Sequence, residues 1–294
     1  MRVFVTGATG FIGSRIVPEL ISAGHQVIGL ARSDAGAQQL TAAGAQVQHG
    51  DLEDLESLRS GAAASDAVIH IAFRHEWTRF AESCELDKRA IETIGAVLRG
   101  SSRPFIVTSG VGVAQGRAAT EDDPPLSSPS IPRVSEVTAI ALIESGVNAS
   151  VMRLPQVHDT VKQGLVTPTI AIARAKGVSA YVGDGLNRWP AAHVTDVARL
   201  YRLALEKVTA GARYHAVAEE GVPLKDIAAV IGRGLNVPVI SISPEKAQEH
   251  FGFLGFFAGR DALVSSAQTR AKLGWDPTGP DLLTDLGNMR YMQD

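Results

Sequence analysis

Three glycines near the beginning of the chain have the spacing of a phosphate-binding turn. Gly7, Gly10 and Gly13 follow the apolar run Val3–Val5 and precede apolar residues at helical spacing. Gly7 allows a tight turn, Gly10 lets a ligand approach the backbone, and Gly13 lets the helix pack on the strand. The free N–H groups and positive dipole end of the helix favour a bound phosphate. The pattern predicts a dinucleotide cradle, with a purely structural turn as the alternative.

The end of the second predicted strand bears on which dinucleotide is bound. Sites for NAD(H) place an acidic residue there, which bonds the ribose 2′-hydroxyl. Here the strand Gln26–Ala31 is followed by Arg32 and Ser33. A planar guanidinium is suited to clamp a 2′-phosphate, and Arg15 just after the cradle adds a second cation. These residues favour NADP(H) over NAD(H), which stays possible; two solvated surface arginines are the alternative interpretation.

Two hydroxyls and an imidazole follow later strands and are suited to act on a substrate oxygen. Thr108 and Ser109 end the fifth predicted strand, where a hydroxyl can bond a carbonyl or simply cap the strand. His75 lies just past the fourth strand and titrates near neutral pH, although a loop histidine is more often only solvated. Because hydride transfer needs a proton donor beside the substrate oxygen, we predict Thr108, Ser109 and His75 as catalytic candidates.

The elements that must position these groups alternate between strand and helix through the first half of the chain. Strands are predicted at Arg2–Thr6, Gln26–Ala31, Gln46–His49, Ala67–Ala72, Phe105–Thr108 and Ser150–Leu154. Helices are predicted at Phe11–Ala23, Ala35–Ala43, Leu55–Ser60, Arg79–Arg99 and Arg133–Ser145. This alternation predicts an α/β fold with a Rossmann-type doubly wound parallel sheet, which binds ligands at the carboxyl ends of its strands.

The second half is less regular and is expected to build a small C-terminal substrate lobe. A loop rich in Pro, Ser and acidic residues spans 116–132, and Ala212–Val217 reads as a strand that returns to the sheet. We assign residues 1–155, with about 193–218, to the dinucleotide-binding core. Residues 156–192 and 219–294 are assigned to the substrate-binding lobe.

Composition excludes several classes of protein. The chain has 294 residues, of which 45% are hydrophobic and 20% charged, and its net charge of −3 gives nucleic-acid binding no electrostatic support. Cys84 is the only cysteine, so disulfides within the chain and cysteine-cluster metal sites are excluded. No apolar run approaches the roughly 18 residues of a membrane span, and no signal pattern precedes the first strand. We therefore expect a cytoplasmic protein without metal, nucleic-acid or membrane partners.

Several segments together resemble the extended and atypical short-chain dehydrogenase/reductases, the group that includes the NAD-dependent epimerases and dehydratases. They are "TGATGFIG" at 6–13, "GDLED" at 50–54, "VIHIAF" at 68–73, "HVTDVARLYRLALE" at 193–206 and "AKLGWDP" at 271–277. The resemblance covers nearly the whole chain and says little about the substrate. It implies cofactor contacts from Gly7, Thr9, Gly10, Phe11, Ile12, Gly13, Arg32, Ser33, Asp51, Leu52, Ile71, Ala72, Phe73, Thr108, Arg153, Pro155 and Val157.

The chain departs from this family at the catalytic pair, Tyr-x-x-x-Lys on the fifth helix. The whole interval Thr108–Arg153 contains neither Tyr nor Lys. If Glu136 is aligned with the acidic residue that usually follows the pair, Ser128 takes the Tyr position and Pro132 the Lys position. The usual acid–base chemistry therefore does not carry over, and an ion pair between Arg133 and Glu136 is expected to replace the pair structurally.

Residues beside the expected nicotinamide are predicted to form the substrate wall. His158 and His193 also suit structural roles, as a loop cap and as an anchor for the lobe. Nothing in the sequence places Tyr181 near the ring. The predicted substrate-binding residues are Phe73, His75, Trp77, His158, Tyr181, Trp189 and His193.

Three functions are compatible with this sequence. The first is an NADP(H)-dependent oxidoreductase acting on a small or medium carbonyl or alcohol. The second is a dinucleotide sensor without catalytic activity, which the missing Tyr and Lys favour. The third is a sugar-nucleotide epimerase or dehydratase with a rebuilt site, although such enzymes usually keep the Tyr and prefer NAD. Extended relatives often pair two long helices between subunits, so a homodimer through Arg79–Arg99 and Arg133–Ser145 is possible by analogy.

Overall fold

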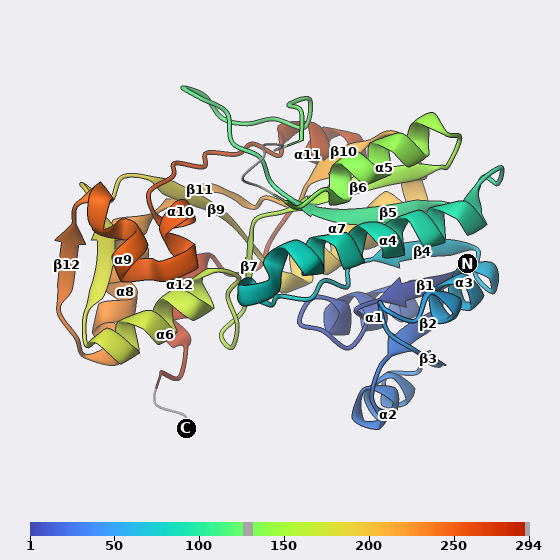
Figure 1. Cartoon of the computed structure of the whole chain (residues 1–294), viewed down its shortest axis with the longest axis horizontal. Helices are drawn as coiled ribbons and strands as arrows, with labels where there is room; N and C mark the ends of the chain where they lie inside the picture. The colour runs from blue at the N-terminus through green and yellow to red at the C-terminus, as the bar shows by residue number, and fades with distance from the viewer. Residues whose placement is uncertain (126–131, 292–294) are drawn as a thin grey trace.

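A seven-stranded parallel sheet forms the centre of the larger part of the molecule (Figure 1). The structure is a computed structural model that describes residues 1–125 and 132–291, so Ser128 lies outside the described residues. The strand order is β10-β6-β5-β4-β1-β2-β3. The strands are β1 (Arg2–Thr6), β2 (Gln26–Ala31), β3 (Gln46–His49), β4 (Ala67–His70), β5 (Phe105–Gly110), β6 (Ala149–Leu154) and β10 (Arg213–His215).

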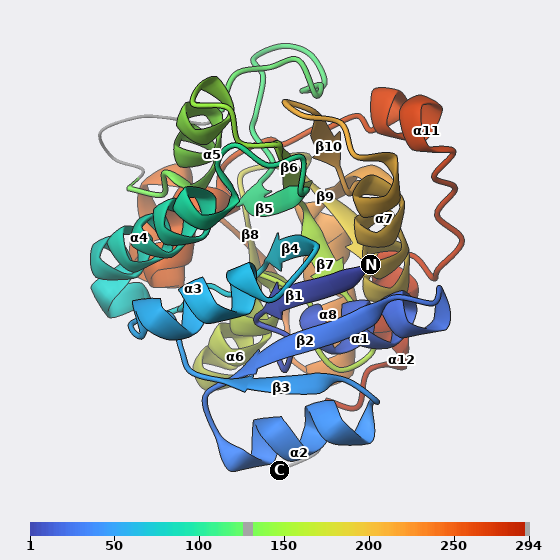
Figure 2. The ribbon, with the colours of Figure 1, turned by 90° about the vertical axis from the view of Figure 1, so that its right-hand side faces the viewer.

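Helices cover both faces of this sheet, as Figure 2 shows. One face carries α3 (Leu55–Ala63), α4 (Phe80–Leu98) and α5 (Ser135–Glu144). The other carries α1 (Gly13–Ser22) and α7 (Val194–Lys207), with α2 (Asp34–Ala42) against β2 and β3 at the edge and α11 (Ala267–Leu273) against α7 and β10. This arrangement confirms the predicted doubly wound α/β fold, including the return of the chain to the sheet as β10.

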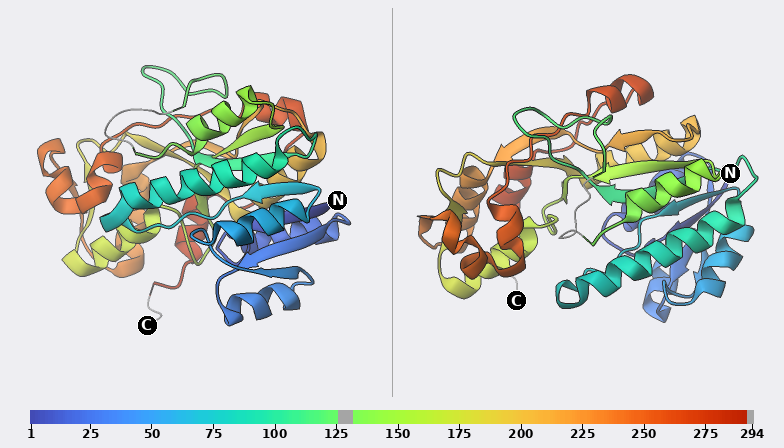
Figure 3. Two further views of the ribbon diagram at one scale, coloured as in Figure 1. Left: turned by 45° about the vertical axis from the view of Figure 1, so that its right-hand side comes forward. Right: turned by 45° about the horizontal axis from the view of Figure 1, so that its top comes forward.

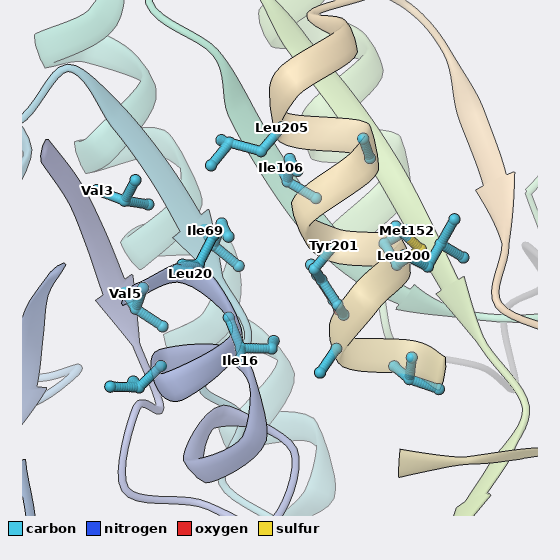
Figure 4. Close-up of a cluster of buried hydrophobic side chains, with 14 of the residues drawn as sticks. Val3, Val5, Ile16, Leu20, Ile69, Ile106, Met152, Leu200, Tyr201 and Leu205 are labelled. Atoms are coloured by element: carbon cyan, nitrogen blue, oxygen red, sulfur yellow. The ribbon is translucent and has the colours of Figure 1, made fainter. Parts of the chain in front are cut away.

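Strand β1 shows why the sheet is buried on both faces. Val3 and Val5 point into the cluster under α1 and α7, while Phe4 between them points into the cluster under α3 and α4. Figure 4 shows the first cluster, in which Tyr201 of α7 lies beside Ile16 of α1 and the strand residues. Successive side chains of β1 point to opposite faces of the sheet, and on both faces they are apolar. This is the pattern of a central strand that is covered on both sides.

The remaining elements form a smaller group beside the carboxyl ends of the strands (Figure 3). It contains a sheet of β7 (Gln156–His158), β9 (Arg188–His193) and β11 (Glu219–Pro223), and a parallel pair of β8 (Ser179–Val182) with β12 (Val239–Ile242). The helices of this part are α6 (Val166–Lys176), α8 (Leu224–Leu235), α9 (Ala247–Phe251), α10 (Gly255–Ala258) and α12 (Leu282–Asn288). The short 3-10 turns are η1 (Trp77–Arg79), η2 (Pro244–Lys246) and η3 (Gly252–Leu254).

No helix in the described ranges is both long and apolar enough to cross a bilayer.

Candidate functional site

A cavity of about 1140 Å³ runs along the carboxyl ends of the strands and reaches the smaller part of the molecule. Its walls come from the segments that follow β1 to β6, and from Trp189, Phe253 and Phe256 of the smaller part. It gathers most of the predicted site residues: Gly7, Thr9, Gly10, Phe11, Ile12, Gly13, Arg32, Asp51, Leu52, Ile71, Ala72, Phe73, His75, Trp77, Thr108, Ser109, Pro155, Val157 and Trp189.

The glycine turn leaves a space that side chains at the glycine positions would fill. Gly7 has a φ of +68°, and a Cβ atom there would lie 2.8 Å from Ala72 Cα. A Cβ atom at Gly13 would lie 2.0 Å from the Gly7 carbonyl oxygen, so α1 can begin here only without a side chain. The first N–H groups of a helix have no partner within the helix and attract a phosphate. The cradle therefore fits the pyrophosphate of a dinucleotide.

Two polar residues mark the end of the cavity beside β2 and β3. Arg32 follows β2 directly and lines the cavity. The Asp51 carboxylate accepts hydrogen bonds from the backbone N–H groups of Glu53 and Asp54 at 2.7 and 3.0 Å, which fixes its orientation. Ser33 instead caps α2 by accepting from the Gly36 N–H, and Arg15 pairs with Asp159 at 3.6 Å. The structure thus brings Arg32 and Asp51 to the cavity, but not Ser33 or Arg15.

A buried chain of hydrogen bonds supports the wall behind the cradle. The Ala72 N–H donates to Thr6 Oγ1 at 3.3 Å, and Thr6 contacts His70 Nδ1 at 2.8 Å. His70 Nε2 contacts Asp87 at 3.0 Å, and the Ser135 hydroxyl donates to the other oxygen of Asp87 at 2.5 Å. Because a carboxylate only accepts, a neutral His70 carries its proton on Nε2 and accepts from Thr6 at Nδ1. The pattern "VIHIAF" contains His70, but nothing in the sequence indicates its partners in this network.

The expected ion pair between Arg133 and Glu136 is wrong. Glu136 binds Arg153 in a fork, with N–O distances of 2.9 and 2.6 Å, and also contacts Arg213 at 3.1 Å. Arg153 is 1% exposed and does not line the cavity, because the carboxylate of Glu136 holds its guanidinium behind the wall. The resemblance implies that Arg153 contacts the cofactor, but its side chain does not reach the cavity in this structure.

Arg133 occupies the cavity side of this region, before α5 begins at Ser135 rather than on the helix. Its guanidinium carbon lies 4.4 Å from the centre of the Phe73 ring. Its Nε donates to Ser135 Oγ at 3.0 Å, and Nη2 donates to the Thr108 carbonyl oxygen at 3.4 Å. The Ser135 bond joins Arg133 to the chain that runs through Asp87. A fixed cation therefore stands near the end of β5.

The two hydroxyls at the end of β5 differ in their partners. Thr108 Oγ1 lies 2.7 Å from the Tyr201 hydroxyl, whose pKa is raised because the ring is buried under the sheet. The Ser109 hydroxyl makes no hydrogen bond to any residue in the described part of the chain. Both residues line the cavity, and within residues 1–125 and 132–291 only the Thr108 hydroxyl has a hydrogen-bond partner.

His75 belongs to an aromatic wall of the cavity. Its ring centre lies 5.0 Å from that of Phe73 and 6.1 Å from that of Trp77. Trp77 stacks on Phe253 of the smaller part, with ring centres 4.2 Å apart. Desolvation lowers the pKa of His75, and the nearby cations of Arg133 and Lys162 lower it further. His75 is thus held neutral at pH 7, which suits an acceptor better than a proton donor.

Three predicted substrate residues do not line the cavity. His158 is fully buried, and its Nδ1 lies 2.7 Å from Asp285. His193 caps α7, and its Nδ1 lies 2.8 Å from the Thr195 hydroxyl oxygen. Tyr181 lies within β8.

Comparisons with known proteins agree with this geometry. The model of the NAD(P)H-binding family matches residues 7–178. The chain is 52% identical over 295 residues to the uncharacterized protein C2A9.02 of Schizosaccharomyces pombe, covering 99% of this chain and 100% of that one. It is 24% identical over 225 residues to a 2-alkyl-3-oxoalkanoate reductase of Stenotrophomonas maltophilia, covering 72% and 67% of the two chains.

Among solved structures, the UDP-glucose 4-epimerase of Thermus thermophilus in complex with NAD has a TM-score of 0.75 at 20% identity, with 99% of both chains covered. This likeness shows the fold and supports the predicted resemblance. The glycine cradle, the doubly wound sheet and the family match lead to one conclusion: this chain belongs to the NAD(P)H-binding family and has the fold of the epimerase/dehydratase group of short-chain dehydrogenase/reductases.

Proposed function

We propose that this protein is an NADP(H)-dependent oxidoreductase that transfers a hydride to or from a small or medium carbonyl or alcohol. The observation that carries the proposal is Arg32. It lies on the cavity wall at the residue after β2, where NAD-binding sites place an acidic residue. It forms no ion pair with any carboxylate in the described part of the chain, so its guanidinium is available for a 2′-phosphate.

Different residues around the cavity have different roles in such a reaction. The N–H groups at the start of α1 bind the pyrophosphate, and Arg32 holds the 2′-phosphate. When bound, the nicotinamide supplies or accepts the hydride. The Ser109 hydroxyl donates a hydrogen bond to the substrate oxygen, while Thr108 is held by Tyr201 and stays in place. The aromatic wall of Phe73, Trp77 and Phe253 excludes water from the reacting atoms.

The first test is a calorimetric titration of the protein with NADPH and then with NADH. We expect NADPH to bind at least tenfold more tightly, a difference of about 1.4 kcal/mol. Arg32→Gln should remove this difference by weakening NADPH alone. Arg15→Gln is the matched control, because Arg15 is a nearby cation that pairs with Asp159 and does not line the cavity. Equal or tighter binding of NADH by the wild type would refute the preference for NADP(H).

A sensor without catalytic activity is the second candidate, favoured by the absence of Tyr and Lys from Thr108–Arg153. A screen of carbonyl substrates with the preferred cofactor separates the two, since a sensor binds the dinucleotide without turnover. An epimerase or dehydratase is the third candidate, favoured by the fold shared with the NAD-bound epimerase. Sugar nucleotide retained by the purified protein, together with a preference for NADH, would favour that third function.

A further inference from the structure

The cavity carries more positive than negative charge on its walls. Arg133, Lys162 and Arg260 all line it, and none of them pairs with a carboxylate within residues 1–125 and 132–291. The carboxylates that line it are both engaged. Glu136 binds two arginines, and Asp51 accepts two backbone N–H groups. The cavity therefore favours anionic ligands beyond what Arg32 alone explains.

These three cations lie against different aromatic rings. Lys162 Nζ is 5.9 Å from the ring centre of Phe11, a residue of the glycine turn, so it belongs to the cofactor end. The guanidinium carbon of Arg260 is 4.3 Å from the ring centre of Phe256 in the smaller part of the molecule. Arg133 is the cation that contacts the end of β5, through the Thr108 carbonyl oxygen. Of the three, only Arg133 is thus hydrogen-bonded to β5, the strand that also carries Ser109.

The contacts of Arg133 leave part of its donor edge open. The guanidinium carbon lies over the Phe73 ring, 4.4 Å from its centre, and this contact is not one of the hydrogen bonds of Arg133. Nε is used by Ser135 and one Nη2 proton by Thr108, while Nη1 makes no hydrogen bond within the described chain. Nη1 and Nη2 can therefore still donate hydrogen bonds to the two oxygens of a carboxylate.

The neighbouring wall is aromatic and is suited to an apolar ligand body. Phe80 lies 5.8 Å from Phe73 and 5.3 Å from Trp77, measured between ring centres, and Trp77 continues to Phe253. All of them line the cavity. A ligand that reaches Arg133 thus meets one fixed cation and a continuous apolar surface.

We propose that the substrate is an amphipathic acid, whose carboxylate binds the guanidinium of Arg133 and whose aromatic or aliphatic body packs on Phe73, Trp77 and Phe80. This proposal rests on the proposed oxidoreductase function and names the substrate class for the same site. Arg133 is here a specificity-determining residue, one position after Pro132, which the family resemblance aligns with the Lys of the catalytic pair.

Binding of a matched pair of small probes tests the proposal without requiring turnover. Cinnamate and cinnamamide share one aromatic body and differ in charge, while acetate has the charge without the ring. Each is titrated by calorimetry into the protein with and without NADP⁺. We expect cinnamate to bind at least tenfold more tightly than either of the other two. A ratio near one between cinnamate and cinnamamide would overturn the role of the carboxylate, and equal binding of acetate would overturn the role of the aromatic wall.

Variants then assign the preference to one residue. In Arg133→Gln, the ratio of the affinity for cinnamate to the affinity for cinnamamide should fall close to one, and the affinity for NADP⁺ should not change. Arg74→Gln is the matched control, because Arg74 lines the same cavity but already pairs with Glu53 at 2.8 Å. The Arg74→Gln variant should keep the wild-type ratio. A ratio that persists in Arg133→Gln, or a loss of NADP⁺ affinity in that variant, would assign Arg133 to another task and overturn the proposal.

Two further outcomes remain informative. If Arg133→Gln does not fold, Arg133→Lys keeps the charge without the planar fork, and we expect it to lose most of the preference. A wild-type ratio in Arg133→Lys would overturn the role of the guanidinium fork. If neither dinucleotide binds, the proposed function fails on its own, and the titrations without NADP⁺ still decide whether Arg133 selects a carboxylate.

Discussion

Replacing Arg153 by methionine is the most direct test of the polar core behind the cavity. The guanidinium is 1% exposed and donates to both oxygens of Glu136, at 2.9 and 2.6 Å. It also donates to the Asp123 carbonyl oxygen at 2.7 Å and lies 3.1 Å from His215 Nε2. One side chain thus joins β6, α5, β10 and the loop at 120–123.

The expected loss can be worked out from these contacts. Removing one partner of a buried ion pair typically destabilises a protein by about 3–5 kcal/mol, because the other charge stays buried. Arg213 remains 3.1 Å from Glu136 and offsets part of this loss. The Asp123 carbonyl and His215 also lose their donor, at about 1 kcal/mol or more for each unsatisfied buried group. We therefore expect Arg153→Met to lower the free energy of unfolding by about 3–5 kcal/mol.

Urea unfolding at pH 7.5, followed by circular dichroism, measures this change. Arg79→Met is the control, because Arg79 pairs with Glu82 on the surface and its loss should leave the midpoint unchanged. The double variant Arg153→Met with Glu136→Met should recover part of the loss, since no buried charge is then left without its partner. A change below about 1 kcal/mol for Arg153→Met would show that this pair behaves as a surface pair and would refute the reasoning.

Three further predictions concern His215 and the two hydroxyls at the end of β5. Burial lowers the pKa of His215, so below its ordinary pKa of 6.5 the unfolded chain binds a proton that the native protein does not. Stability should therefore fall as the pH drops from 7.5 to 5.5, and the fall should be smaller in His215→Gln; equal urea midpoint shifts in both proteins would contradict this. At the end of β5, Ser109→Ala should reduce turnover at unchanged NADPH affinity. Thr108→Val should instead lower the free energy of unfolding by about 1–3 kcal/mol, because it leaves the buried Tyr201 hydroxyl without a partner. If Thr108→Val reduced turnover and Ser109→Ala lowered stability instead, the roles assigned to the two residues would be wrong.

The first half of the fold could be predicted closely because its signals are local. The observed strands β1, β2 and β3 have the predicted bounds, and α4 differs from the predicted Arg79–Arg99 by one residue at each end. Strand β4 ends at His70 instead of Ala72. Ile71 and Ala72 lose their sheet partners at this point and become part of the cavity wall. A sequence pattern of apolar residues does not distinguish these two environments.

The partners of polar side chains could not be predicted, because they are distant in the sequence. Thr108 meets Tyr201 across 93 positions, and His70 reaches Thr6 across 64. Glu136 had a cation three positions away at Arg133, yet it pairs with Arg153 across 17 positions. Parallel strands bring such residues together only once the order of strands is known. The short strands β7, β9 and β11 cannot be recognised from local sequence for the same reason, since they pair with one another across long stretches of chain.

The choice of partner at Glu136 has a consequence for chemistry at the site. Because Glu136 pairs with Arg153 and Arg213, Arg133 lines the cavity without a carboxylate partner in the described part of the chain. A guanidinium does not give up its proton near neutral pH, so Arg133 can hold a carboxylate but cannot replace the missing tyrosine as an acid. His75 is held neutral by desolvation and by the cations around it. In the proposed reaction, the proton for the substrate oxygen therefore passes through the Ser109 hydroxyl or water, and Arg133 contributes binding and orientation alone.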